Sequence, residues 1–211
     1  MAERPYVGRG GLKLEHALRE FKIDVTGLTA ADFGCNIGGF TDCLLRHGAR
    51  RVYAVDTGYG MLDYNLRRDE RVIVRERTNA LHAPPPDEPI DLVVIDAGWT
   101  PQRLIVPAAL HWLGGREAGR IITLIKPHYE RSADPSAPRA GRSDRGVLDD
   151  DEARRIAEEV LVALPALGAT VLAWTASPIR GGASKGRTGN LEYLACLRPT
   201  AGGVSRAEMW S

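Results

Sequence analysis

The stretch TAADFGCNIGGFTDCLLRHGA, residues 29–49, has the pattern of a strand, a glycine-rich turn and a helix in succession. We expect a strand at 29–32, a glycine-rich turn in GCNIGGF at 34–40, and a helix in the amphipathic segment 41–49. Glycines after a strand let the backbone approach a bound molecule closely. In an open α/β sheet, ligands bind beyond the carboxyl ends of the strands. The stretch therefore predicts a ligand site at the end of a strand.

The flanking sequence alternates between apolar strands and helical segments. Further strands are predicted at 50–56, 71–77, 89–96, 120–127, 169–177 and 191–199, and helices at 12–21, 60–69, 101–113 and 149–167. Pro101 is expected in the first turn of its helix. The last two strands lack a helix-length connection, so we expect them to pair antiparallel. The pattern predicts an α/β fold with a mostly parallel seven-stranded sheet and helices on both faces.

Length and composition place limits on the class of protein. A chain of 211 residues fits one domain, with 1–25 as its N-terminal segment and helix and with 131–146 as a flexible loop rich in Arg, Ser, Pro and Gly. No apolar run reaches the roughly 18 residues that span a bilayer, and no secretory signal precedes the first helix. Three cysteines without a CxxC pair predict reduced thiols. We expect a cytoplasmic protein with no membrane segment and no metal site.

The charge of the chain gives no global signal for nucleic acid, because the net charge is only +1. Arginines cluster at 4–19, 46–51, 67–77 and 131–145, and such clusters can bind phosphates. Charge alone favours the simpler interpretation, a solvated surface.

The glycine turn has the pattern D-x-G-x-x-x-G-G, whereas a nicotinamide site prefers G-x-G-x-x-G. An acid at the strand end suits a cationic ligand, and S-adenosylmethionine (SAM) carries a sulfonium and an ammonium group. Asp56 follows the second strand and could accept from ribose hydroxyls, while Thr78 and Asn79 could flank an adenine. The expected SAM-binding residues are Asp32, Gly34, Asn36, Gly38, Gly39, Phe40, Thr41, Asp56, Thr57, Thr78, Asn79 and Asp96.

Charged residues also stand at the ends of the two most apolar strands. Asp96 ends DLVVID, and Lys126 ends IITLIK. Lys13 lies in the glycine-flanked segment GRGGLKL, and Glu192 opens the last strand. For each of these four residues considered alone, a surface ion pair is the simpler interpretation. Their joint placement predicts that they meet at the cleft.

Several segments together resemble the TlyA family, the haemolysin-A-like members of the FtsJ/RrmJ group of ribosomal RNA 2′-O-methyltransferases. The resemblance covers nearly the whole chain and is carried by RGGLKLEHAL (9–18), the long segment 32–80 that begins with DFGCNIGGF, DLVVID (91–96), LIKPHYE (124–130) and GNLEYL (189–194). It implies a Rossmann-like methyltransferase fold, SAM as methyl donor, and ribosomal RNA or ribosomal subunits as partners. It also implies a Lys-Asp-Lys-Glu catalytic set at Lys13, Asp96, Lys126 and Glu192.

The chemistry of ribose methylation explains such a set. A ribose hydroxyl is a poor nucleophile, so its proton must leave as its oxygen attacks. A lysine that is buried near another cation can act as the base, because its pKa falls towards neutrality. We expect Lys126 to orient and deprotonate the hydroxyl, Asp96 to position Lys126 and the methyl end, and Lys13 and Glu192 to hold the ribose.

The chain departs from the family pattern in two places. The family usually has an N-terminal S4 RNA-binding domain, and this chain begins where that domain would end, so a separate RNA-binding partner is one expectation. After the catalytic aspartate, the family's DVSFISL is replaced by DAGWTPQ (96–102), where Trp99 is a candidate for stacking on a base or for a core or rim position.

Two other functions stay open. A SAM-dependent O-methyltransferase for a small molecule fits the missing S4 domain and the altered segment. The basic loops 131–145 and 180–187 favour RNA, since a small substrate does not need them. A membrane-active protein, suggested by the name haemolysin, has no apolar span to support it. The oligomeric state and the modified nucleotide are not predicted.

Overall fold

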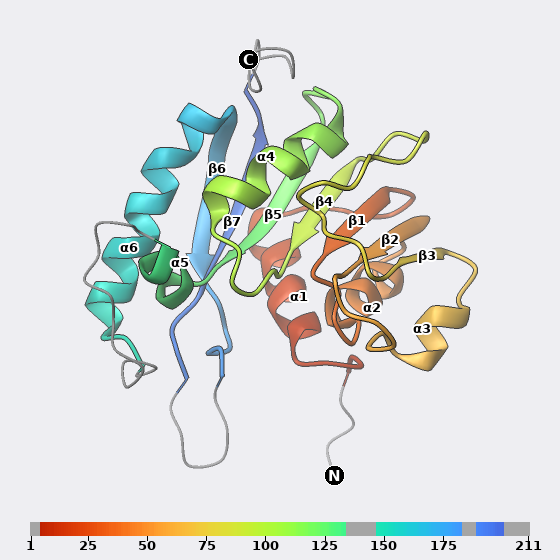
Figure 1. Cartoon of the computed structure of the whole chain (residues 1–211), viewed down its shortest axis with the longest axis horizontal. Helices are drawn as coiled ribbons and strands as arrows, with labels where there is room; N and C mark the ends of the chain where they lie inside the picture. The colour runs from red at the N-terminus through yellow and green to blue at the C-terminus, as the bar shows by residue number, and fades with distance from the viewer. Residues whose placement is uncertain (1–4, 134–146, 183–188, 201–211) are drawn as a thin grey trace.

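The computed structural model of the protein describes residues 5–133, 147–182 and 189–200. Its strands are β1 (Thr29–Phe33), β2 (Arg51–Val55), β3 (Val72–Arg75), β4 (Leu92–Ile95), β5 (Arg120–Ile125), β6 (Ala169–Ala176) and β7 (Tyr193–Pro199). They form a seven-stranded sheet in the order β3-β2-β1-β4-β5-β7-β6 (Figure 1). Neighbouring strands from β3 to β5 run parallel, and β7 is antiparallel to both β5 and β6. This confirms the predicted sheet and the antiparallel pairing of the last two strands.

Helices cover both faces of the sheet (Figure 1). They are α1 (Gly10–Phe21), α2 (Gly39–Arg46), α3 (Tyr64–Arg68), α4 (Gln102–Leu113), α5 (Pro127–Ala133), α6 (Asp150–Ala163) and the 3-10 turn η1 (Leu164–Leu167). Apolar side chains of α1, α2 and α3 form one core with the sheet, and those of α4 and α6 form a second core on the opposite face. The helices are therefore on both faces, as predicted.

The central strands explain this layering. All five residues of β1 and all four of β4 are buried, because each strand is covered on both faces. Phe33 of β1 packs edge-on against Trp112 of α4, with ring centroids 5.0 Å apart. The Trp112 indole also donates to the carbonyl of Ala83 at 3.0 Å, so its one polar group is satisfied in the core.

Several predicted boundaries differ from those of the structure, and three of the differences have a clear cause. The helix predicted at 60–69 begins only at Tyr64, because the Asp63 side chain accepts from the Asn65 amide and caps it there. Pro101 is the extended N-cap of α4 instead of lying in its first turn. The segment predicted as a flexible loop from 131 begins inside α5, a helix whose first turn is closed by amides that donate to the carbonyl of Lys126. Residues 134–146 lie outside the described residues.

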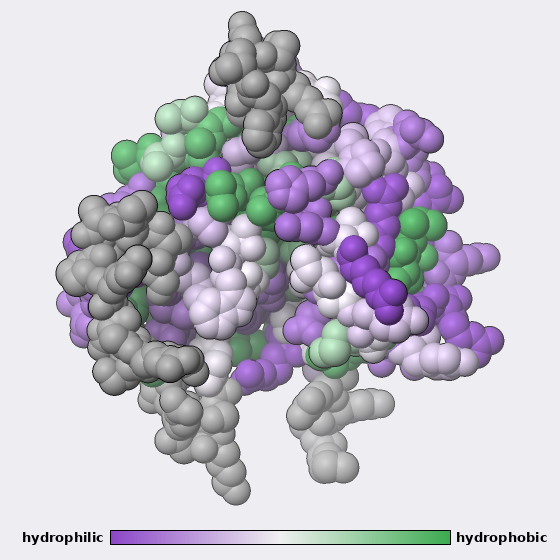
Figure 2. Space-filling view, viewed as in Figure 1, coloured by the Kyte–Doolittle hydropathy of each residue, from purple (hydrophilic) through white to green (hydrophobic). Residues whose placement is uncertain are grey.

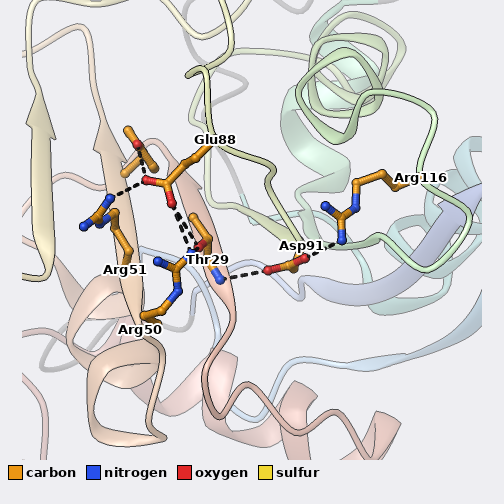
Figure 3. A network of polar contacts seen from close by, with 7 residues as sticks. Thr29, Arg50, Arg51, Glu88, Asp91 and Arg116 are labelled. Atoms are coloured by element: carbon orange, nitrogen blue, oxygen red, sulfur yellow. Dashed lines mark hydrogen bonds and ion pairs between the residues drawn. The ribbon is translucent and has the colours of Figure 1, made fainter.

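A polar network fastens the amino ends of the strands (Figure 3). The Glu88 carboxylate accepts from Tyr53 Oη at 2.6 Å, from Arg51 at 2.7 Å and from Arg50 at 3.1 Å. These hydrogen bonds lower the pKa of Glu88 from 4.5 to about 2. Asp91 joins the network by accepting from the Thr29 amide, at the start of β1. The network lies where β1 and β2 begin, away from their carboxyl ends.

The helices are short compared with a lipid bilayer. The longest, α6, has 14 residues, which at about 1.5 Å per residue is well below the roughly 30 Å of a hydrocarbon core. Among the described residues, no helix is long and apolar enough to cross a membrane.

Candidate active site

A cleft of about 890 Å³ opens at the carboxyl ends of β1, β2, β4 and β5. The four catalytic candidates all line it: Lys13, Asp96, Lys126 and Glu192. Of the expected SAM-binding residues, the cleft is also lined by Gly34, Asn36, Gly39, Phe40, Asp56, Thr57, Thr78 and Asn79. Residues from distant parts of the sequence thus converge on one site, as the parallel sheet predicts.

Glycines shape the loop between β1 and α2. Gly34 has φ +86°, and a Cβ there would lie 2.8 Å from the carbonyl oxygen of Asp96. A Cβ on Gly39 would lie 3.0 Å from the amide of Gly11 in α1. Gly38, at φ +98°, has no room for a side chain because Leu66 packs against it. These glycines are required by close packing of the loop against the rest of the protein, in addition to any approach of a ligand.

Asp32 and Thr41 lie behind this loop and do not line the cleft. Asp32 is fully buried, and its Oδ2 accepts from Thr41 Oγ1 at 2.7 Å. Its other oxygen, Oδ1, has no hydrogen-bond partner among the described residues. Burial raises the pKa of Asp32 from 3.8 to about 7. Asp32, Gly38 and Thr41 thus support the loop from behind, whereas the sequence placed them in contact with the ligand.

Asp56 is well placed to bind a ribose. Its Oδ2 accepts from the amide of Asn36 at 2.9 Å, and its Oδ1 accepts from the amide of Gly58 at 2.7 Å. A carboxylate oxygen has capacity for about two hydrogen bonds, so each oxygen can accept one more. Thr78 is fixed beside it, since its amide donates to the Asp56 carbonyl at 2.9 Å. The donor and acceptor set at this end of the cleft fits the adenosyl part of SAM.

Two lysine–carboxylate pairs border the other end. Lys126 Nζ lies 2.6 Å from Asp96 Oδ1, and these residues directly follow β5 and β4. Lys13 Nζ, on α1, lies 2.5 Å from Glu192 Oε2, just before β7. The second pair is the more buried, with side chains 10% and 3% exposed. Burial raises the pKa of Glu192, while Lys13 opposes that rise. The structure brings together the four residues that the sequence proposed as a set.

Aromatic residues complete this end of the cleft: Trp99, which the sequence had singled out, and Tyr129 and His128, which it had not. Lys126 Nζ lies 5.9 Å from the centroid of the Tyr129 ring, and Trp99 packs against Tyr129 with centroids 4.5 Å apart. Trp99 is 80% exposed, so it occupies the rim and not the core. Burial, with the charges of Lys126 and Lys13, lowers the pKa of His128 from 6.5 to about 4. His128 is therefore neutral near pH 7. The only sequence signal for His128 and Tyr129 is their position directly after LIKP.

A polar cluster links the segments that carry Asp96 and Lys126. Gln102 begins α4, and its amide donates to Glu130 Oε1 at 2.9 Å. The Gln102 side chain accepts from Thr123 Oγ1 at 2.7 Å and donates to the Leu124 carbonyl at 3.3 Å. Burial raises the pKa of Glu130 from 4.5 to about 7. The cluster links the chain after Asp96 to the chain around Lys126, and nothing in the sequence pattern had indicated it.

The predicted basic loops are only partly described. Arg180 lines the cleft and makes a two-pronged ion pair with Asp150 at the start of α6, at 2.8 Å and 2.5 Å. Asn190 tethers the same region, because its Oδ1 accepts from the amide of Leu148. Residues 134–146 and 183–188, which hold most of the predicted basic positions, lie outside the described residues.

Comparison with known proteins agrees with this geometry. The sequence model of the FtsJ-like methyltransferases matches residues 6–198. The chain belongs to the FtsJ-like methyltransferase family. The chain is 37% identical over 196 residues to a Bacillus subtilis protein provisionally named rRNA methyltransferase YqxC, covering 91% of this chain and 65% of that protein. It is 38% identical over 199 residues to the 16S/23S rRNA (cytidine-2′-O)-methyltransferase TlyA of Mycobacterium tuberculosis, covering 93% of this chain and 70% of that protein.

Solved structures support the same family fold. A Lactococcus lactis structure provisionally named a hemolysin is 37% identical, with a TM-score of 0.79, and the match covers 93% of this chain and 89% of that one. Membership in the FtsJ-like family confirms the expected Rossmann-like fold of a SAM-dependent methyltransferase, and the relatives confirm the resemblance to TlyA. The chain spans about two thirds of the length of the Bacillus subtilis relative.

Proposed function

We propose that this FtsJ-like enzyme transfers a methyl group from SAM to a ribose 2′-hydroxyl of ribosomal RNA. The observation that carries the proposal is the pair of lysine–carboxylate contacts, Lys126–Asp96 and Lys13–Glu192, at one cleft. Ribosomal RNA as substrate is also supported by the Mycobacterium tuberculosis relative, which is named for cytidine 2′-O-methylation of 16S and 23S rRNA. We further propose that residues 1–211 act as one methyltransferase domain, in the cytoplasm with its ribosomal substrate.

The cofactor would be held by the residues at the adenosyl end of the cleft. Asp56 would accept from ribose hydroxyls, with Thr78 and Asn79 beside the base. The backbone of Gly34 and Asn36 borders the middle of the cleft, where the methionine part fits. When bound there, SAM supplies an electrophilic methyl group.

The residues at the other end would prepare the acceptor. Lys126 Nζ orients the ribose hydroxyl and takes its proton as the oxygen attacks. Asp96 fixes Lys126 through the 2.6 Å contact and keeps the amine directed into the cleft. Lys13 and Glu192 form a buried pair that holds the ribose. His128 is neutral near pH 7, so it adds no charge beside Lys126.

The test is methyl transfer from labelled SAM, with total ribosomal RNA, ribosomal subunits and a small-metabolite extract offered in parallel. Label in RNA that survives as an alkali-resistant dinucleotide establishes 2′-O-methylation, because a methylated 2′-oxygen cannot assist cleavage of the next phosphodiester bond. Label only in the metabolite fraction would replace the RNA substrate by a small molecule, the alternative that the altered DAGW segment left open.

If the protein binds SAM but no fraction becomes labelled, one further reaction is needed. The reaction is then repeated with a purified S4 RNA-binding domain added in trans, since the relatives are longer than this chain. Transfer to RNA restored by that domain supports the proposal and identifies a required RNA-binding partner. No transfer in any arm overturns it.

A further inference from the structure

Two exposed tyrosines outside the cleft each carry an arginine on the ring. Tyr59 is 68% exposed, and the guanidinium carbon of Arg77 lies 4.0 Å from its ring centroid. Tyr64 is 66% exposed, and Arg68 lies 5.4 Å from its centroid while donating to its hydroxyl at 3.2 Å. We call these four residues the tyrosine–arginine rim.

These arginines differ from most other exposed arginines in the part of the chain that the structure describes. Arg154 and Arg155 on α6, for example, pair with Glu158 and Glu159. Within residues 5–133, 147–182 and 189–200, neither Arg68 nor Arg77 forms an ion pair.

The acids near the rim mostly have other partners. Asp63 caps α3, Glu76 binds Arg67 at 2.6 Å, and Asp69 binds Arg71 at 2.7 Å. Glu70 is exposed on the turn that leads into β3. The two guanidinium groups are thus held by aromatic rings and keep their charge for an anionic partner.

The rim is continuous with the cleft. Tyr59 lies on the connection from β2 to α3, and Arg77 lies just after β3. The amide of Arg77 donates to the carbonyl of Gly58 at 3.0 Å, which ties the two connections together. Their neighbours Thr57 and Thr78 line the cleft. Figure 1 shows α3 at the β3 edge of the sheet, and the surface over it is mainly hydrophilic (Figure 2).

We propose that the tyrosine–arginine rim binds single-stranded RNA beyond the adenosyl end of the cleft, in the same strand as the acceptor ribose, an inference that rests on the proposed function. An arginine stacked on an aromatic ring keeps its N–H edges available, and those edges match phosphate oxygens. An exposed tyrosine ring offers a face on which a base of any identity can stack. Alternation of aromatic and cationic groups is the pattern of single-strand binding surfaces, and a carboxylate-rich partner protein would leave the tyrosine faces unused.

The experiment compares Arg68→Gln/Arg77→Gln with the matched control Arg154→Gln/Arg155→Gln, which removes two exposed arginines from α6. Binding of a labelled single-stranded oligoribonucleotide is measured over a series of KCl concentrations. Two lost phosphate contacts should reduce the slope of log affinity against log salt by about 1.4, and weaken binding about tenfold at low salt. The control should leave the slope unchanged. SAM affinity reports that each variant is folded.

A second variant separates stacking from charge. Tyr59→Leu/Tyr64→Leu should weaken RNA binding and leave the salt slope close to that of the wild type, since no cation is removed. If the wild type binds and methylates RNA but both rim variants bind it like the control, the rim proposal is overturned and the proposed function stands. If the wild type binds no RNA and labels only metabolites, the proposed function fails, and the rim proposal fails with it.

Discussion

At the amino ends of the strands, Glu88 is enclosed by Arg50, Arg51 and Tyr53 (Figure 3), whereas at the carboxyl ends Lys126 meets Asp96 beside a cleft of about 890 Å³. Both regions pair cations with carboxylates at similar distances. They differ in what surrounds the pair: the amino-end groups close on one another, while the carboxyl-end groups border an open volume.

The surroundings of the two sets of ion pairs indicate which charges stabilise the protein and which can act on a ligand. Glu88 accepts from four side chains, Thr29 Oγ1 among them, so little of its hydrogen-bonding capacity remains for a ligand. Lys126 has one carboxylate partner, so the rest of the hydrogen-bonding capacity of its Nζ can still meet a hydroxyl in the cleft. We therefore expect substitutions at the carboxyl end to affect methyl transfer first, and substitutions at the amino end to affect stability alone.

The largest effect is expected from Lys126→Ala. Loss of the group that takes the proton should lower the rate of methyl transfer by about 10²–10⁴-fold. SAM affinity should stay within about twofold, because the adenosyl end of the cleft is formed by Asp56, Thr78 and Asn79. Single-turnover transfer and calorimetric SAM binding measure the two quantities.

Lys22→Gln is the matched control, since Lys22 is an exposed lysine at the end of α1. It should leave both transfer and SAM binding unchanged. An equal loss of transfer and SAM affinity in Lys126→Ala would show that Lys126 holds the cofactor and does not act on the acceptor.

The Lys13–Glu192 pair should affect both stability and transfer, because it is buried and lies at the cleft. Lys13→Met leaves Glu192 buried without its cation, at a cost of about 3 kcal/mol in unfolding free energy near pH 8. The cost should shrink as the pH falls, because burial already raises the pKa of Glu192 and loss of the Lys13 charge removes the group that opposes this rise, so the carboxylate takes up a proton more readily.

The double variant Lys13→Met/Glu192→Leu sharpens this prediction. Replacing both charges by apolar groups should restore most of the lost stability, because no buried charge is left unpaired. Methyl transfer should stay low. Urea denaturation and single-turnover transfer on the same samples measure stability and methyl transfer. If the double variant recovered both stability and methyl transfer, the Lys13–Glu192 pair would have only a packing role.

At the amino end, Glu88→Gln should lower the free energy of unfolding by about 1–2 kcal/mol, a figure that allows for screening by water. The rate of methyl transfer should stay unchanged. The folded-state pKa of Glu88 is lowered from 4.5 to about 2, so its contribution is fully present above pH 4.5 and disappears as the pH falls towards 2. Urea denaturation at pH 7 and at pH 3 should therefore show a larger difference from wild type at pH 7. A loss of transfer without a loss of stability would contradict the comparison of the two ends.

Much of the fold and part of the site could be predicted from local sequence. The strands β1 and β4 are continuous apolar runs, and the glycine turn between β1 and α2 has few conformational alternatives. Because parallel strands end at one edge, Asp96 and Lys126 had to come close once their strands were recognised. Lys13 and Glu192 stood out by their positions in the chain, but the resemblance to a known family was needed to make them part of one catalytic set, since nothing local says that α1 and the start of β7 meet.

The features of the site that could not be predicted depend on contacts between segments that are distant in the sequence. The sequence could not show that Asp32 faces Thr41 behind the loop, because a strand-end acid can point to either face. It also could not show that Glu130 reaches the amide of Gln102, 28 residues away in the chain. Asp32 and Glu130 both have few polar neighbours, and burial in the tertiary structure is the largest cause of their raised pKa values.

Glu130 gives the smallest predicted effect, and it tests whether the cluster behind the cleft differs from the network at the amino end. Its folded-state pKa is raised from 4.5 to about 7, the opposite direction to that of Glu88. A raised carboxyl pKa means that the folded state favours the protonated form, so the stabilising contribution is largest below pH 4.5 and is lost as the pH rises through 7. Glu130→Gln keeps an acceptor for the Gln102 amide but cannot ionise.

The variant should therefore match wild type near pH 5 and exceed it by about 1 kcal/mol near pH 8, as measured by urea denaturation at the two pH values. Glu152→Gln, which removes a half-buried carboxylate of α6 that pairs with Arg131, is the matched control for loss of a carboxyl group. Equal pH dependence in Glu130→Gln and wild type would mean that Glu130 ionises as freely in the folded state as in the unfolded chain. The cluster would then be as open to water as a surface ion pair, and it could not hold the segments around Asp96 and Lys126 rigidly against each other.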